Sequence, residues 1–187
     1  METDRRVKYT KMVLRESLIT LMQRKPVSRI SIKELCEEAD VNRATFYAHY
    51  ADQFDLLQKI QSDFIDDIKS YLDNFALEVG ETDLLQMITK ICEYIAQNGE
   101  LCRVLLGSNG NADFQTNVMR IISQRIVFEW VKKKRVDGVT AEYIYTYVAT
   151  GSVGVIRKWL SDPHPKSPGE IAELITRLAN KGIETFI

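Results

Sequence analysis

Apolar residues recur every three or four positions along almost the whole chain, and no segment shows the sustained alternation of a β-strand. Leu14, Leu18 and Leu21 are one example, because their spacing places the three side chains on one face of a helix. The chain has 187 residues, of which 45% are hydrophobic and 27% charged, which is enough for a substantial core. The sequence therefore predicts an all-α fold with about nine helices and no sheet.

Capping residues mark where several of these helices begin. Ser31, followed three residues later by Glu34, is a capping box, and Asn42 and Asp52 are good N-caps. Pro168 suits the first position of the last helix. The expected helices span about 6–24, 32–40, 43–49, 52–75, 83–97, 100–106, 113–135 and 140–161, with a turn at 137–138 and a last helix from 168.

The composition argues against a membrane-spanning protein and against a metal-binding protein. The longest apolar runs are far shorter than the roughly 20 residues that cross a bilayer. The charged N-terminal residues do not resemble a secretory signal, so we expect a cytoplasmic protein without a membrane partner. Cys36, Cys92 and Cys102 form no CxxC pair, and His49 and His164 are the only histidines. A disulfide framework, a structural zinc site and a multi-histidine metal site are therefore not expected.

No residue pattern indicates an enzyme. The sequence contains no recognisable nucleophile–base motif and no glycine-rich phosphate loop. Asp66 and Asp67 are adjacent on one predicted helix and point in different directions, so we expect them to be solvated surface residues. The interpretation is a protein without catalytic residues or a cofactor.

Charge is distributed unevenly although the net charge is only −1. Residues 1–50 carry an excess of three positive charges, residues 51–100 an excess of eight negative charges, and residues 101–187 an excess of four positive charges. A basic N-terminal segment suits a nucleic-acid partner, although such runs are more often solvated helix faces. The change of sign near Asp52 predicts a domain of residues 1–51 and a second of 52–187.

Residues 31–50 have the spacing of a helix-turn-helix, with a helix of about two turns, a three-residue turn and a second short helix. Phe46 and Tyr50 are four residues apart and can face inward together. The opposite side of the second helix then carries Arg43, Ala44, Tyr47 and Ala48, with Thr45 at its edge. This arrangement predicts a recognition helix that presents its N-terminal residues to the major groove.

The side chains of this region have suitable chemistry for DNA. Arg43 can bond guanine O6 and N7 or a phosphate, and Thr45 can bond a phosphate or touch a thymine methyl. Tyr47 and His49 have polar tips suited to phosphate oxygens, although either could instead pack, and His49 could cap. The candidate DNA contacts are Arg5, Arg6, Lys8, Ser31, Lys33, Asn42, Arg43, Ala44, Thr45, Tyr47, His49 and Gln53.

The stretch VNRATFYAHYADQFDLL, residues 41–57, resembles the recognition helix and following core helix of the TetR family of bacterial transcription regulators. The resemblance extends over about residues 8–60. Residues 105–110 (LLGSNG) and 151–160 (GSVGVIRKWL) resemble, more loosely, the branch that contains the dihydroxyacetone-kinase operon activator. The chain has Asp40 where the family usually has Gly, Cys36 where Ala is usual, and Gln53 where a phosphate-contacting Lys is common. The loss of that lysine lowers the expected phosphate affinity.

The resemblance implies a homodimer formed by the last two helices. Small residues such as Gly151 and Ser152 allow close approach of helices, although an ordinary intramolecular core would also use them. The candidate interface residues are Gly151, Ser152, Val155, Trp159, Ile171, Leu174, Ile175 and Leu178.

The resemblance also implies a small-molecule site between the fourth and seventh helices. Aromatic and methionine side chains at helical spacing could line it, and they are also typical of plain core. The candidates are Tyr71, Met87, Ile91, Tyr94, Phe114, Val118, Phe128 and Tyr147.

Together these features predict an N-terminal helix-turn-helix domain followed by a helical regulatory and dimerisation domain. The predicted function is a homodimeric, sequence-specific regulator that binds a near-palindromic double-stranded DNA operator and responds to an unidentified small-molecule effector. Two alternatives remain: control by a protein partner, or an interaction module that does not bind DNA.

Overall fold

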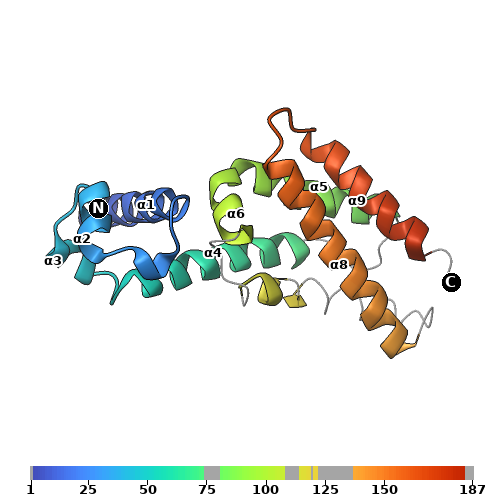
Figure 1. Cartoon of the computed structure of the whole chain (residues 1–187), viewed down its shortest axis with the longest axis horizontal. Helices are drawn as coiled ribbons and strands as arrows, with labels where there is room; N and C mark the ends of the chain where they lie inside the picture. The colour runs from blue at the N-terminus through green and yellow to red at the C-terminus, as the bar shows by residue number, and fades with distance from the viewer. Residues whose placement is uncertain (1, 74–80, 108–113, 119, 122–136, 184–187) are drawn as a thin grey trace.

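The computed structural model describes residues 2–73, 81–107, 114–118, 120–121 and 137–183 (Figure 1). Every regular element in this part of the chain is helical, which confirms the all-α prediction. The elements are α1 (Glu2–Met22), the 3-10 helix η1 (Val27–Arg29), α2 (Ile32–Glu38), α3 (Arg43–Tyr47), α4 (Gln53–Asp73), α5 (Glu81–Gln97), α6 (Gly99–Leu106), α8 (Gly138–Leu160) and α9 (Pro168–Ile183). Residues 114–118 and 120–121 are also helical; most of the predicted helix 113–135 lies outside the described residues. No described helix is long and apolar enough to span a bilayer.

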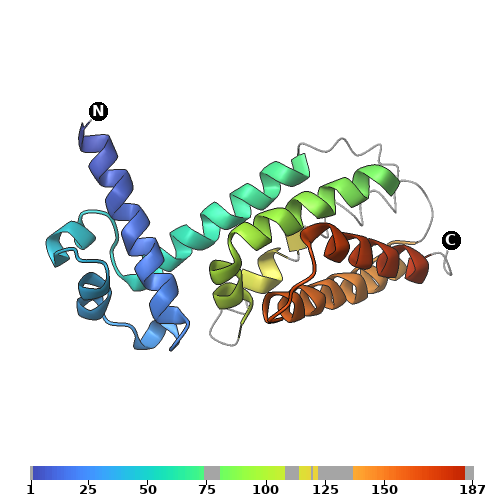
Figure 2. The same cartoon turned by 90° about the horizontal axis from the view of Figure 1, so that it is seen from above.

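The molecule has two ends, which we call the head and the body. The head contains α1, α2 and α3, and α4 leads from it into the body formed by the later helices (Figures 1 and 2). Leu14, Leu18, Leu35 and Phe46 are completely buried in the head. The predicted boundary at Asp52 falls at the start of α4, whose hydrophobic residues continue through both parts.

The N-caps predicted at Ser31 and Asp52 are formed, whereas the carboxylate of Glu34, expected to complete a capping box, pairs with Lys25 at 2.6 Å. The hydroxyl oxygen of Ser31 accepts a hydrogen bond from the backbone N–H of Glu34 at 3.2 Å. The carboxylate oxygen of Asp52 accepts from the backbone N–H groups of Phe54 and Asp55, both at 2.8 Å. These bonds satisfy N–H groups that have no partner within the helix.

Asp137 requires one correction. It was expected to form a turn with Gly138, but it is the N-cap of α8, and Gly138 is the first residue of that helix. Its carboxylate oxygen accepts from the backbone N–H groups of Val139 and Thr140 at 3.1 and 3.0 Å. Asp followed by Gly is typical of both a turn and a helix start, so the sequence pattern alone was ambiguous.

The body is built around α4 and α5. The inner face of α4 buries side chains at helical spacing, namely Leu56, Leu57, Ile60, Phe64, Ile68 and Leu72. α5 packs against α4 and α9, and α8 packs against α6 and α9 (Figure 2).

Candidate nucleic-acid interface

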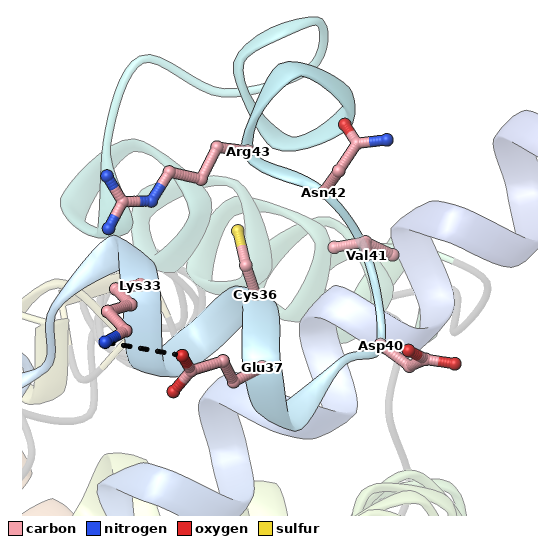
Figure 3. Close-up of a pocket in the computed structure, with 7 residues that line it drawn as sticks. All are labelled: Lys33, Cys36, Glu37, Asp40, Val41, Asn42 and Arg43. Atoms are coloured by element: carbon pink, nitrogen blue, oxygen red, sulfur yellow. Dashed lines mark ion pairs between the residues drawn. The ribbon is translucent and has the colours of Figure 1, made fainter.

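The turn between α2 and α3 sets the geometry of the helix-turn-helix. Asp40 has a φ of 51°, in the left-handed region that glycine favours and that Asp tolerates better than most residues. Asn42 then begins α3, because its Oδ1 accepts from the backbone N–H of Thr45 at 2.7 Å. A shallow, open pocket of about 390 Å³ lies beside this turn, between the two helices (Figure 3). It is lined by Lys33, Cys36, Glu37, Asp40, Val41, Asn42 and Arg43.

The two faces of α3 differ as the spacing predicts. Phe46 is completely buried, and its ring centroid lies 5.8 Å from that of Tyr50, which is also buried. On the other side Tyr47 is 57% exposed, and its ring meets Phe46 edge-on at 5.5 Å. Arg43, Ala44 and Ala48 are exposed beside it. A rigid aromatic ring and a guanidinium therefore face solvent from one short helix.

Thr45 is half-buried, and its hydroxyl is already engaged. It donates to Asn42 Oδ1 at 2.9 Å, the same oxygen that caps the helix. A phosphate oxygen is also an acceptor, so Thr45 must give up this bond to donate to DNA. The sequence identified both residues as candidates but did not predict this competition.

Lys33 and Glu37 form an exposed ion pair at 3.7 Å on the rim of this open pocket (Figure 3). Sequence reasoning did not single out Glu37, although its i+4 spacing from Lys33 is the signal for such a pair. Cys36 lies between the two helices and is buried, which raises the pKa of its thiol. This burial makes Cys36 a small hydrophobe of the head core.

The remaining head candidates lie at several positions. Arg5, Arg6 and Lys8 are exposed on the first turns of α1, ahead of the first residue with a described buried side chain, Thr10. α1 extends freely at this end (Figure 2). The other candidates are Ser31, exposed at the start of α2, and His49 and Gln53, both half-buried.

In the body, the structure brings part of the predicted pocket set together. Tyr94 lies between two aromatic neighbours, with ring centroids 5.4 Å from Phe64 and 5.5 Å from Tyr71. Phe64 in turn lies 5.8 Å from Phe114. We call these four residues the aromatic cluster. The pocket candidates chosen from the sequence did not include Phe64.

The other pocket candidates lie outside the aromatic cluster, some in the core and one on the surface. Met87 is buried, and Ile91 and Val118 are half-buried against the same core. Tyr147 is 77% exposed on α8, so the structure does not place it with the aromatic cluster. Phe128 lies outside the described residues.

Asp66 and Asp67 are both exposed, as expected, but Asp67 also has a partner on another helix. Its Oδ2 accepts a hydrogen bond from the hydroxyl of Tyr94 at 2.7 Å, which joins α4 to α5. Burial raises the pKa of Tyr94, and the hydrogen bond to Asp67 raises it further, so Tyr94 is a neutral donor. Asp66 pairs with Lys69 of the same helix at 3.5 Å.

The predicted interface set divides between the inside and the outside of the body. Trp159, Ile171 and Ile175 are buried within this chain, and the indole N–H of Trp159 donates to the carbonyl of Lys166 at 2.7 Å. These three residues therefore belong to the intramolecular core, which corrects their assignment. Val155 and Ser152 are half-buried.

The outer members of that set are Gly151, Leu174 and Leu178. Leu178 is 59% exposed, and a Cβ built on Gly151 would meet no atom within 4 Å. Val139 and Tyr143, which the sequence analysis did not select, are exposed on α8 along the same i, i+4 series as Tyr147. We call Val139, Tyr143, Tyr147, Gly151, Leu174 and Leu178 the outer α8–α9 surface.

The described residues contain no group of three or more His, Cys, Asp or Glu side chains that could hold a metal ion. Cys92 and Cys102 are buried, which raises the pKa of their thiols to about 11 and about 12. Neither thiol is ionised near neutral pH, so neither is poised for nucleophilic chemistry.

Three solved structures have the same fold at low sequence identity. NalD of Pseudomonas aeruginosa, the secondary repressor of the MexAB-OprM efflux pump, aligns with a TM-score of 0.73 at 14% identity, covering 94% of this chain and 97% of NalD. FadR of Bacillus subtilis, determined with stearoyl-CoA, aligns at 0.67 and 14% identity, covering 92% and 98%. The dihydroxyacetone kinase operon activator DhaS aligns at 0.61 and 17% identity, covering 95% and 97%.

Sequence comparison gives the family directly. No curated protein sequence matches the chain significantly. A TetR family model described as "Transcriptional regulator C-terminal region" matches residues 82–181, which is more than half of the chain. Together with the fold shared by these regulators, the match shows that the chain belongs to the TetR family of transcriptional regulators.

Proposed function

We propose that the protein is a homodimeric regulator that reads a near-palindromic DNA operator through α3 and is released or recruited by a small-molecule effector. The observation that carries the proposal is the division of α3 into two faces. Phe46 anchors the helix in the head, while Arg43 and Tyr47 face solvent on the other side. A short helix held in this way can present its N-terminal residues to a major groove.

In a major groove the exposed side chains would have different roles. Arg43 would bond a guanine edge, and Tyr47 would bond a phosphate. Arg5 and Arg6 add cations on the free end of α1 that can reach phosphates or the minor groove. Two heads in one dimer would occupy successive major grooves about 34–36 Å apart.

The outer α8–α9 surface supports the homodimer. Its apolar side chains are exposed in the single chain, although apolar area of this kind is usually covered by another surface. Gly151 lies on this surface with open space around it, so a second helix can approach closely. A self-complementary patch of this type is what a two-fold dimer requires.

The aromatic cluster supports an effector site in the body. Phe64, Tyr94 and Phe114 are buried beside the half-buried Tyr71 and Ile91, which gives an apolar region with a few hydroxyl groups. Small-molecule sites have this composition. The FadR structure shows that the same fold can hold an acyl-CoA ligand, and we infer a small-molecule effector for this chain without assigning its identity.

Selection of bound sequences from a random duplex pool, with purified protein at moderate salt, tests the proposal. We expect a two-fold symmetric motif. Arg43→Ala should relax the preference at one position of each half-site and weaken operator binding by about 1–3 kcal/mol per head. Lys69→Ala removes a cation from an exposed position on α4, outside the head, and should leave the motif and the affinity unchanged.

Two outcomes would contradict the proposal. If Arg43→Ala selects the same motif with the same affinity, α3 is not the reading element. If no sequence is enriched and binding to mixed duplex does not fall as salt is raised, the head does not bind DNA by phosphate contacts. The interaction module would then be the better interpretation.

A further inference from the structure

Thr45 of α3 has two groups that DNA can recognise, a hydroxyl and a methyl. The sequence leaves both roles open, because the hydroxyl can bond a phosphate and the methyl can touch the methyl of a thymine. In the structure the hydroxyl donates to Asn42 Oδ1 at 2.9 Å. Both groups branch from the same Cβ, so a bond that holds the hydroxyl also fixes the direction of the methyl.

The acceptor of this bond is itself held in place. Asn42 Oδ1 also accepts from the backbone N–H of Thr45 at 2.7 Å, which is the capping bond that begins α3. Figure 3 shows Asn42 at the point where the turn enters this helix. The hydroxyl can donate to a phosphate only by breaking its bond to the capping oxygen. The methyl can contact DNA while both bonds to Asn42 stay formed.

The position of Thr45 on α3 also suits a contact with a base. The residue is half-buried, with the exposed Ala44 before it and the buried Phe46 after it. Arg43 and Tyr47, two positions away on either side, are exposed. Thymine presents one apolar group in the major groove, its C5-methyl, and side-chain methyl groups recognise it by apolar contact. A threonine methyl at the edge of a groove-facing helix therefore matches a thymine.

We propose that Thr45 is a specificity-determining residue that reads the C5-methyl of a thymine with its own methyl. Asn42 is the positioning residue, because its bond to the hydroxyl leaves the methyl as the group presented to DNA. The inference rests on the proposed function, since it requires α3 to lie in a major groove. It adds the base and the chemical group that this position of the helix recognises.

The experiment replaces thymines of the selected operator with deoxyuridine, one symmetric position at a time. Deoxyuridine pairs as thymidine does and lacks only the C5-methyl. We call the ratio of the affinities for the thymine and deoxyuridine operators the uracil penalty. For the wild type we expect one thymine position with a uracil penalty of about fourfold per half-site, the effect of one buried methyl group.

Two variants of Thr45 separate the methyl from the hydroxyl. Thr45→Ser keeps the hydroxyl and removes the methyl, so it should bind the thymine operator about fourfold more weakly per half-site and show no uracil penalty at that position. Thr45→Val keeps a methyl and removes the hydroxyl, so its uracil penalty should equal that of the wild type. Thr89→Ser makes the same deletion on α5 of the body, where the hydroxyl bonds the carbonyl of Leu85 at 2.7 Å, and should change neither affinity.

The positioning role of Asn42 has a separate readout. Asn42→Ala frees the Thr45 hydroxyl, so the uracil penalty should fall. Adding Thr45→Val should restore the penalty, because valine in its preferred helical rotamer keeps a methyl where threonine has one. A cap that only stabilises α3 would weaken binding to both operators alike and would leave the penalty unchanged. Circular dichroism checks that each variant is folded.

Three outcomes would overturn the inference alone. The first is a symmetric motif in which no thymine shows a uracil penalty. The second is a Thr45→Val variant that binds every operator more weakly while Thr45→Ser behaves as the wild type, which would show that the hydroxyl bonds a phosphate. The third is an Asn42→Ala variant with the wild-type penalty, which would remove the positioning role. A selection that enriches no sequence would instead refute the proposed function, and the inference with it.

Discussion

At the scale of single residues, the head depends on a few side chains that each hold a helix end. Asn42 is one of them, and its Oδ1 accepts from both the backbone N–H and the hydroxyl of Thr45. Such caps are encoded by the residue itself and its neighbour three positions later. This is why the sequence was sufficient to predict them.

Asn42→Ala should lower the free energy of unfolding by about 1 kcal/mol, because α3 loses its capping acceptor. Asn42→Asp keeps an acceptor oxygen and should retain stability, while its negative charge weakens DNA binding. Urea unfolding followed by circular dichroism measures the first effect, and operator titration the second. Equal stability of the alanine variant and the wild type would show that the cap does not stabilise the head.

At the scale of elements, the α2–α3 unit contains one costly backbone position. Asp40 has a positive φ, and every residue with a Cβ is disfavoured there relative to glycine. The turn forms nevertheless, because the cores of α2 and α3 fix its ends through Leu35 and Phe46. An Asp at this position therefore supports the turn where the family usually has Gly.

Asp40→Gly should raise the free energy of unfolding by about 0.5–1 kcal/mol, since glycine relieves the left-handed strain. Glu38→Gly, at the last helical residue of α2, should change it by a similar amount in the opposite direction. Thermal unfolding of the two variants beside the wild type provides the measurement. Loss of stability in both variants would show that the backbone at Asp40 is not strained.

At the scale of the whole molecule, the proposed function links the head to the outer α8–α9 surface. A single head has few contacts with DNA, and pairing through the outer α8–α9 surface would let the second head bind at high local concentration. The same surface contains Leu178, which packs poorly in the single chain. Oligomeric state and operator affinity should therefore change together.

Leu178→Asp should leave the chain folded, convert the dimer to a monomer and weaken operator binding by about 10²–10⁴-fold. The physical reason is a buried unpaired carboxylate in the interface. Light scattering after gel filtration gives the mass, and circular dichroism confirms the fold. Met12→Asp, an exposed apolar position on α1, is the matched control and should remain dimeric. A dimeric Leu178→Asp variant would place the interface elsewhere.

The sequence by itself determined most of the described helices, the caps at Ser31, Asn42 and Asp52, and the two faces of α3. These properties depend on residues within four positions of one another, as between Phe46 and Tyr50 or Asn42 and Thr45. The resemblance over residues 8–60 pointed to the TetR family. The family model that matches residues 82–181 shows this membership independently.

Only the tertiary structure decided which of several apolar faces turns inward. α8 and α9 are apolar on more than one side, so the spacing could not show that Trp159 and Ile171 are buried while Tyr143 and Leu178 are exposed. The choice depends on α5 and α6, which pack on one side of the pair and are distant in sequence. The bond between Tyr94 and Asp67 has the same origin, because 27 residues separate the two, and only the packing of α5 on α4 brings donor and acceptor together.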